Sequence, residues 1–336
     1  MHSRDLRADR RLEVGLALLA ERRPTAAAKA VEAALEIDPG YGDAWFALGE
    51  ARELAGHRRR AAAAWRRYLA LEPADPLGAG LRLALLGAAP PPGRPPEAYV
   101  TRLFDQYAPR FDTALRGGLG YDAPELLAEA VAEAGRARTP DGALLPRRVL
   151  DLGCGTGLCG PLFREQAVWL EGLDLSPGML ARAHERRVYD ALVAGEAVRH
   201  LAAVGSAADL GTGARFDLIV AADVLVYLGD LSALFQAAFG ALAPGGLFAF
   251  TLERGLEADP PQPYRLQASQ RYAHHPAGAA ALAAAAGFET LTLAPASFRL
   301  EAGRPVPGVV VLLRRPEAAT APLLLALEVP RGRPTA

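Results

Sequence analysis

The sequence of 336 residues contains little cysteine, little lysine and no surplus of charge of one sign. Its two cysteines, Cys154 and Cys159, are too few for a disulfide framework or a four-ligand zinc site. Lys29 is the only lysine, and the formal net charge of −1 leaves no basic excess to draw the molecule onto nucleic acid. We therefore expect neither a bound metal nor a nucleic-acid partner.

Long apolar runs are also missing. The run at 322–328 is far shorter than the ~18 uncharged apolar residues that a membrane-spanning helix needs. Residues 1–7 mix both charges and contain no apolar core, so they do not resemble a signal peptide. We therefore expect a cytoplasmic protein without a membrane partner. The length leaves room for two folded units.

An internal repeat occupies the first quarter of the chain, because residues 8–41 align with 42–75 at a period of 34. The coinciding pairs are Gly15 with Gly49, Ala27 with Ala61, Leu35 with Leu69, and Pro39 with Pro73. The pattern resembles the tetratricopeptide repeat, and residues 77–87 resemble its capping helix. The resemblance implies an all-α module over 8–87, which either binds a protein or peptide partner or only packs against a neighbouring domain.

A proline-rich segment at 88–96 follows, and we expect an extended linker there. Residues 97–315 are expected to form the second domain and residues 316–336 a disordered tail. The second domain should open with helices over 97–112 and 122–135.

From residue 148 onward, short apolar strands alternate with helices, which predicts a mainly parallel sheet covered on both faces. We expect strands over 148–152, 168–174, 191–194, 216–222, 246–252, 288–293 and 309–313. Helices are expected over 157–166, 176–187, 196–204, 230–242 and 276–286, with a glycine loop at 211–213 and a long polar loop after the fifth strand. No helix separates the last two strands, so they should pair antiparallel. The fold class is therefore α/β, with a Rossmann-like seven-stranded sheet.

The most informative segment is 149–157, an apolar strand that ends in an acid and runs into a Gly-x-Gly-x-Gly turn. Glycines let the backbone pass close to a ligand, and free N–H groups at a helix start can bind a carboxylate. A dinucleotide site uses the same physics, but Leu158 stands where it needs a small residue. Asp151 would also repel a pyrophosphate, whereas it suits a cationic ligand.

This segment resembles the first motif of class I S-adenosylmethionine-dependent methyltransferases. The resemblance implies that five residues hold the amino-acid end of S-adenosyl-L-methionine: Asp151, Gly153, Cys154, Gly155 and Gly157. Asp174 ends the second strand, 17 residues after Gly157, where an acid is placed to accept both ribose hydroxyls.

Four further positions match the family's pattern. Leu175 and Met179 correspond to apolar walls of the adenine site, although Met179 also fits a plain core position. Glu196 corresponds to the acid near the adenine amino group, although a glutamate at a helix start has an ordinary explanation too. Asp223, after the fourth strand, matches the position that closes over the methionine part, and it is our first candidate for contacting both cofactor and substrate.

The segment 103–112 resembles the lead-in helix of small-molecule methyltransferases related to the quinone-biosynthesis and trans-aconitate enzymes. This implies a lid over the cofactor, with Tyr107 near the sulfonium as a second catalytic candidate. Together with the repeats, it resembles a bacterial group of predicted methyltransferases with N-terminal tetratricopeptide repeats.

The loop after the fifth strand should rim the substrate pocket, or else be an ordinary solvated loop. Its candidate residues are Glu253, Tyr264, Arg271 and His274. The sequence thus predicts a methyltransferase with an unidentified acceptor, and a small molecule is favoured. The alternatives are a protein methyltransferase that binds its target through the repeats, a non-catalytic adaptor, and a nicotinamide oxidoreductase.

Overall fold

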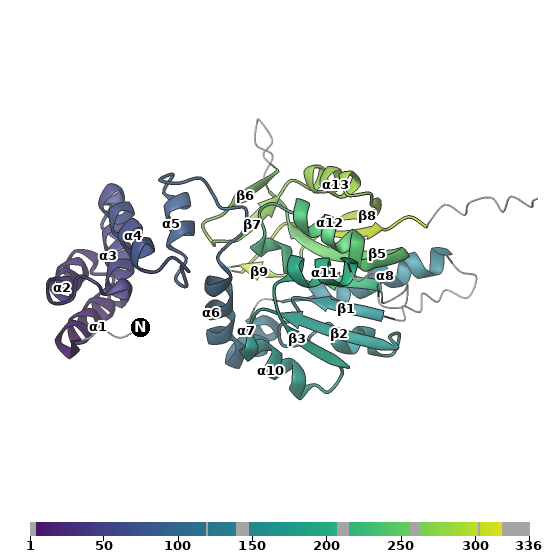
Figure 1. Cartoon of the computed structure of the whole chain (residues 1–336), viewed down its shortest axis with the longest axis horizontal. Helices are drawn as coiled ribbons and strands as arrows, with labels where there is room; N and C mark the ends of the chain where they lie inside the picture. Colours follow the sequence, from purple (N-terminus) through teal and green to yellow (C-terminus); the bar gives the residue numbers. More distant parts are fainter. Residues whose placement is uncertain are drawn as a thin grey trace, which may run out of the picture.

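The computed structural model describes residues 5–118, 120–138, 148–206, 215–255, 263–301 and 303–317. Helices make up the first part of the chain and a seven-stranded sheet dominates the second (Figure 1). None of the described helices is both long and apolar enough to cross a membrane. The glycine loop expected at 211–213 and nearly all of the expected tail, 318–336, lie outside the described residues.

The first four helices form two hairpins. They are α1 (Leu6–Ala20) with α2 (Pro24–Ile37), and α3 (Gly42–Leu54) with α4 (Arg58–Leu71). A Cβ atom on Gly15 would lie 2.4 Å from Val31 Cγ2, and one on Gly49 would lie 2.2 Å from Trp65 Nε1. Gly15 and Gly49, like Val31 and Trp65, are 34 residues apart. The same pair of positions therefore brings the two helices of each hairpin together, and each hairpin needs glycine there.

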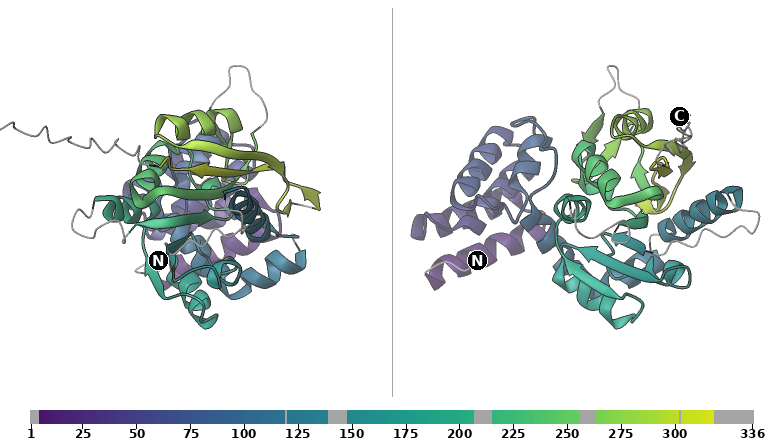
Figure 2. Two further views of the ribbon diagram at one scale, coloured as in Figure 1. Left: turned by 90° about the vertical axis from the view of Figure 1, so that its right-hand side faces the viewer. Right: turned by 45° about the vertical axis from the view of Figure 1, so that its right-hand side comes forward.

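Helix α5 (Ala79–Leu85) and the residues after it join the hairpins to the sheet domain. Leu81 is fully buried in a cluster with Leu266 and Tyr272 of that domain. The Tyr272 hydroxyl donates to the carbonyl of Pro92 at 2.6 Å, and the N–H of Gly229 donates to the carbonyl of Gly93 at 2.8 Å. The segment expected to be only an extended linker is thus fastened to the second domain, and the helical part stands beside that domain (Figure 2).

A broken helix enters the second domain. We expected one helix over 97–112, whereas the structure has α6 (Glu97–Tyr107), the 3₁₀ turn η1 (Ala108–Arg110) and α7 (Phe111–Gly118). Pro109 lies within η1. Proline has no backbone N–H and clashes with the preceding turn of an α-helix, which accounts for the change of direction there.

The sheet has the strand order β3-β2-β1-β4-β5-β11-β8. Its strands are β1 (Arg148–Leu152), β2 (Trp169–Asp174), β3 (Ala191–Ala194), β4 (Phe216–Ala221), β5 (Leu242–Glu253), β8 (Glu289–Ala296) and β11 (Gly308–Arg314). The first five pair in parallel, whereas β11 pairs antiparallel with both β5 and β8. The predicted α/β class, the mostly parallel sheet and the antiparallel end are confirmed.

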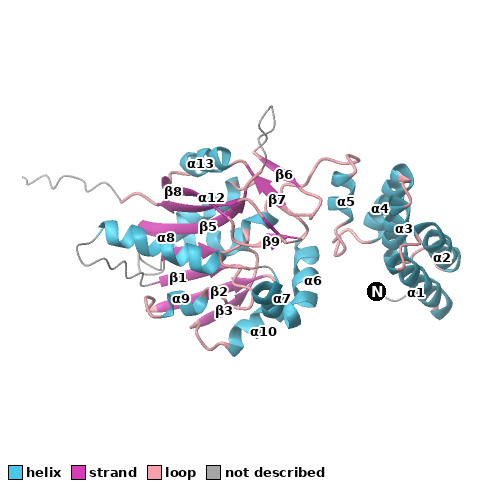
Figure 3. Cartoon of the chain, turned by 180° about the vertical axis from the view of Figure 1, so that it is seen from behind, coloured by secondary structure: helices cyan, strands magenta, loops and turns pink. Residues whose placement is uncertain are grey.

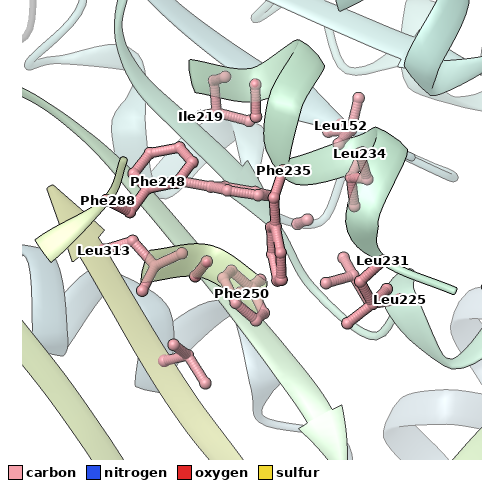
Figure 4. Packing of buried hydrophobic residues seen from close by; sticks show 14 of the residues in the cluster. Leu152, Ile219, Leu225, Leu231, Leu234, Phe235, Phe248, Phe250, Phe288 and Leu313 are labelled. Carbon is pink, nitrogen blue, oxygen red and sulfur yellow. The ribbon is translucent and has the colours of Figure 1, made fainter. Parts of the chain in front are cut away.

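Helices cover both faces of the sheet. They are α8 (Ala123–Arg138), α9 (Gly160–Arg164), α10 (Pro177–Glu185), α11 (Ala197–Ser206), α12 (Ser232–Ala241) and α13 (Pro276–Ala285). Successive strand residues point to opposite faces, so Leu150 packs in the core with α11, α12 and α13, and Val149 packs in the core with α8 and α9. Figure 4 shows Phe235, Phe248 and Phe250 together in the first of these cores. Figure 3 shows α8 lying along the opposite face.

Two parts of the sheet domain differ from the prediction. The helix expected over 157–166 is only α9 (Gly160–Arg164), because Gly157 still belongs to the preceding turn, with a φ of +84° and its N–H bonded to the carbonyl of Cys154 at 2.8 Å. The polar loop after β5 contains a hairpin, β6 (Tyr264–Leu266) with β7 (Tyr272–His274), and a second short pair, β9 (Leu300–Glu301) with β10 (Arg304–Pro305), precedes β11.

Candidate functional site

A cavity of about 500 Å³ lies at the carboxyl ends of β1, β2 and β4. This is where parallel α/β sheets bind ligands, because the loops after neighbouring strands diverge there. Its lining combines the residues after these strands with side chains of α6 and α7 and of the β6–β7 turn. Such a volume falls in the range of ordinary small-molecule sites, roughly 300–1,000 Å³.

The glycine-rich turn forms one wall of the cavity. Gly153 and Gly155 line it, and both have a positive φ, +67° and +54°. A Cβ on Gly153 would lie 2.6 Å from Val224 Cγ2, so glycine is required there for close packing as well as for the turn. The N–H of Gly155 donates to Oδ2 of Asp174 at 2.9 Å, which fixes the turn to the end of the second strand.

Asp174 faces the cavity from the end of β2, next to Leu175. Its Oδ1 accepts the N–H of Ser176 at 2.8 Å, so the backbone holds both carboxylate oxygens in place. Burial raises the pKa of Asp174 above its usual value, because loss of water disfavours the ionised carboxylate more than the backbone hydrogen bonds from Ser176 and Gly155 favour it. A rigid carboxylate of this kind is suited to accept hydrogen bonds from a ligand.

Asp151 lies behind the glycine turn rather than in the large cavity. Together with Cys154 it lines a smaller space of about 40 Å³, whose lining shares Gly153 and Gly155 with the large one. The Tyr189 hydroxyl donates to Oδ2 of Asp151 at 2.6 Å. Burial raises the pKa of Asp151 to about 7, so a cation arriving next to it would favour the ionised form.

The remaining predicted cofactor residues divide into two groups. Glu196 lines the cavity, but its carboxylate also accepts the N–H groups of Val198 at 3.0 Å and Arg199 at 2.9 Å at the start of α11. Met179 is fully buried and Gly157 packs against Tyr189, and neither residue lines the cavity. The ordinary explanation of Met179 as a core residue therefore describes its position.

Asp223 lines the cavity after β4, in an unusual conformation. Its φ is +58°, a left-handed value that costs energy in a residue other than glycine, and its N–H donates to Thr251 Oγ1 at 2.9 Å. Its carboxylate pairs with Arg299, a guanidinium that is only 3% exposed. Burial raises the pKa of Asp223, although Arg299 opposes this effect.

Arg299 and Arg271 share one acid. Arg299 pairs with Glu253, and Arg271 Nε lies 3.0 Å from the same Oε1 atom of Glu253. Arg271 Nη2 also pairs with Glu301 at 2.9 Å. Arg299 and Arg271 both line the cavity, so the part of the site next to Asp223 carries a network of alternating charges.

Three of the residues predicted to rim the substrate pocket do not line the cavity: Glu253, Tyr264 and His274. Tyr264 packs on Tyr272 with ring centroids 5.7 Å apart, and neither Tyr264 nor His274 lines the cavity. His274 is buried with Nε2 3.2 Å from the carbonyl of Gly229, and burial lowers its pKa to about 4. The hairpin explains the positions of Tyr264 and His274. It turns both side chains away from the cavity, and only the tip of the hairpin lines it.

Aromatic side chains of the broken helix cover the cavity. Tyr107 lines it, and its ring contacts that of Phe111 at 5.4 Å between centroids, while Phe104 contacts Tyr227 at 5.2 Å. Asp105 holds this cover down: its Oδ1 accepts the Ser176 hydroxyl at 2.6 Å and the N–H of Gly178 at 2.9 Å. The helix therefore closes over the loop that follows Asp174.

Sequence reasoning missed several lining residues. They are Phe104, Phe111, Tyr121, Tyr227, Gln270 and Arg299. Phe104 and Phe111 stand in the lead-in segment and could have been named with Tyr107. Arg299 had one signal, because a charged residue flanked by Phe298 and Leu300 just before the last strand is unusual, but nothing in the sequence indicates its partners.

Comparison with known proteins agrees with this geometry. Residues 119–293, more than half of the chain, match the family described as "Methyltransferase domain". The trans-aconitate 2-methyltransferase of Methylobacterium nodulans is 38% identical over 156 residues, which are 46% of this chain and 54% of that protein. The ubiquinone biosynthesis O-methyltransferase of Idiomarina loihiensis is 30% identical over 160 residues, covering 40% of this chain and 63% of that protein.

The matched part thus spans little more than half of these curated relatives. Among solved structures, an S-adenosylmethionine-dependent methyltransferase from Mesorhizobium loti has 23% identity and a TM-score of 0.39, covering 55% of this chain and 96% of that chain. The family match covers the glycine turn, the strand ends and the hairpin described above. The chain therefore belongs to the methyltransferase domain family.

Proposed function

We propose that this protein transfers the methyl group of S-adenosylmethionine to a small-molecule acceptor. The observation that carries the proposal is one cavity lined by a glycine turn, by the fixed carboxylate of Asp174 and by the charged pair of Asp223 with Arg299. The relatives named for trans-aconitate and ubiquinone biosynthesis support a small acceptor. An acceptor lying under α6 and α7 would be enclosed by side chains, which favours a small molecule over a protein substrate.

The residues at and near the glycine turn fit the cofactor. Asp174 would accept the ribose hydroxyls, Gly153 and Gly155 would pass close to the amino-acid part, and Leu175 would flank the adenine. Asp151 would act on the positively charged amino group from the smaller space behind the turn, where the two spaces share their lining. We leave Met179 and Gly157 out of the contact set because neither lines the cavity.

Methyl transfer of this kind does not require a strong acid or base from the protein. When bound, S-adenosylmethionine supplies a methyl group on a positively charged sulfur, which leaves as a neutral thioether. The chain has to align an acceptor atom and exclude water. Tyr107 and Phe104 line the cavity, and Asp223, which lines it as well, would receive a proton that the acceptor loses.

For the helical part, we propose that the two hairpins and α5 are tetratricopeptide-like repeats with their cap. Support comes from the shared 34-residue register of Gly15 with Val31 and of Gly49 with Trp65. The burial of Leu81 against Tyr272 favours packing on the methyltransferase domain as one role of this module.

The proposal is tested by incubating the protein with methyl-labelled S-adenosylmethionine and cell extract separated by size. We expect label in the low-mass fraction, together with formation of S-adenosylhomocysteine, and no label with the Asp174→Ala variant. Label confined to macromolecules would replace the proposal with protein methylation. Absence of cofactor turnover in every fraction would leave the non-catalytic adaptor.

A separate prediction concerns the cover. Asp105→Ala removes the acceptor of two hydrogen bonds that fasten α6 to the loop after Asp174. We expect the free energy of binding S-adenosylhomocysteine to weaken by about 1.4 kcal/mol. This corresponds to about tenfold weaker affinity in calorimetry. Gln106→Ala, an exposed position on the same helix, serves as the control and should bind normally. Equal affinities of the two variants would show that the cover does not depend on Asp105.

A further inference from the structure

The turn of the β6–β7 hairpin brings Arg271 to the cavity, and hydrogen bonds hold the backbone of this turn in place. The N–H of Gln267 donates to the carbonyl of Arg271 at 2.8 Å, and the N–H of Gln270 donates to the carbonyl of Gln267 at 2.8 Å. The Tyr99 hydroxyl on α6 donates to Gln270 Oε1 at 2.9 Å. A guanidinium on such a tight, anchored turn loses little freedom when it binds a ligand, and this favours affinity.

Three guanidiniums line the cavity among the described residues, and their partners differ. Arg94 faces Glu196 at 3.6 Å, near the cofactor loops. Arg299 is 3% exposed and lies between two acids of the network, Asp223 and Glu253. Its partners are 18% and 3% exposed, and Arg299 itself is held by both of them, so its pairs are not readily exchanged for a ligand. That leaves Arg271 as the cation best placed to change partners.

The outer partner of Arg271 is weakly held. Glu301 stands on the short strand β9, and its side chain is 52% exposed, whereas that of Glu253, the inner partner, is 3% exposed. A pair with an exposed partner contributes only about 0–1 kcal/mol, because water solvates the separated charges well. Exchanging Glu301 for another carboxylate also leaves the net charge around Arg271 unchanged.

We propose that the acceptor is a small carboxylic acid whose carboxylate binds Arg271 in place of Glu301. The inference rests on the proposed function, because it takes the cavity to hold cofactor and acceptor together. The planar guanidinium can pair with a carboxylate through two parallel hydrogen bonds, which fixes the orientation of the bound molecule as well as its position. The aromatic lining of Tyr227 and Tyr121 would then hold the apolar part of the acid.

The first test measures binding of phenylacetate and glutarate, each against its neutral amide, to protein saturated with S-adenosylhomocysteine. We expect each acid to bind at least tenfold more tightly than its amide. In Arg271→Gln this preference should disappear. In Arg265→Gln, an exposed arginine on the same hairpin, it should remain. Absence of any preference for the acids in the unaltered protein would overturn the proposal.

The second test is a gain of affinity, which a folding defect cannot imitate. Glu301→Gln removes the competing carboxylate and should tighten the binding of phenylacetate and glutarate by about threefold or more while the amides are unaffected. Unchanged or weaker binding of the acids would contradict the exchange. S-adenosylhomocysteine affinity, measured by calorimetry in every variant, should stay within about twofold of the parent. If the unaltered protein does not bind this nucleoside, the proposed function fails, whereas the preference for acids is still measurable without it.

Discussion

Replacing Asp174 with alanine is expected to weaken the binding of S-adenosylmethionine by about 100-fold or more. The carboxylate is half-buried at the carboxyl end of β2, and the N–H groups of Gly155 and Ser176 hold its two oxygens. Each hydrogen bond from a ligand hydroxyl to a charged acceptor contributes about 1.5–3 kcal/mol, and two such bonds are lost together. Calorimetry with S-adenosylmethionine and with S-adenosylhomocysteine measures the change directly.

Two further variants separate the ligand contact from the support of the turn. Asp174→Asn keeps the size and one oxygen, and we expect it to bind about tenfold more weakly than the parent, between parent and alanine variant. Glu185→Ala, at the exposed end of α10, is the matched control and should bind normally. Unchanged affinity in Asp174→Ala, with an unaltered melting temperature, would remove Asp174 from the ribose site.

The second large effect is expected from Arg299→Met. The guanidinium is 3% exposed between Asp223 and Glu253, and methionine keeps much of its volume without the charge. Asp223 then loses its ion pair, and Glu253 keeps only its pair with Arg271. Breaking a buried pair in this way costs about 3–5 kcal/mol in the free energy of unfolding. Urea unfolding at pH 8 should show this loss, whereas Arg314→Met, which breaks an exposed pair with Glu289, should cost about 0–1 kcal/mol.

The pH dependence of this loss has a definite sign. Without Arg299, the pKa of Asp223 in the folded variant lies above that in the unfolded chain, because burial disfavours the ionised form and the opposing charge of Arg299 is gone. The folded variant therefore binds more protons than the unfolded chain, and its stability falls as the pH rises through the folded pKa of Asp223. The deficit relative to the parent should be smaller at pH 5 than at pH 8. A deficit that is equal at both pH values would contradict the assignment.

The parts of the site next to the sheet could be predicted from the sequence, because local patterns determine them. The strand ending at Leu152 is an apolar run, and the turn after it needs glycine at 153 and 155 for its positive φ. Asp174 ends the next apolar run. These features need no knowledge of distant residues, so their placement at one edge of a parallel sheet follows from the alternation of strands and helices.

The acceptor side could not be predicted in the same way, because it depends on pairs that are distant in the sequence. Arg299 meets Asp223 and Glu253, residues separated from it by 76 and 46 positions. The hairpin that carries Arg271 lies in a polar segment whose strands have three residues each, too short for an alternating pattern to be visible. Tyr264 and His274 were named because they stand in the loop after the fifth strand, and the hairpin places them outside the cavity.

The packing of the β6–β7 hairpin against α5 has a consequence for how the acceptor specificity of this enzyme could change. Leu266 and Tyr272 of the hairpin rest on Leu81, which belongs to the helical module, whereas the glycine turn and Asp174 rest on the sheet. Substitutions in α5 would thus shift the β6–β7 hairpin, which carries Arg271. They would leave the glycine turn and Asp174 unchanged. A lineage could retune its choice of acid by altering a surface remote from the chemistry, with the methyl donor held constant.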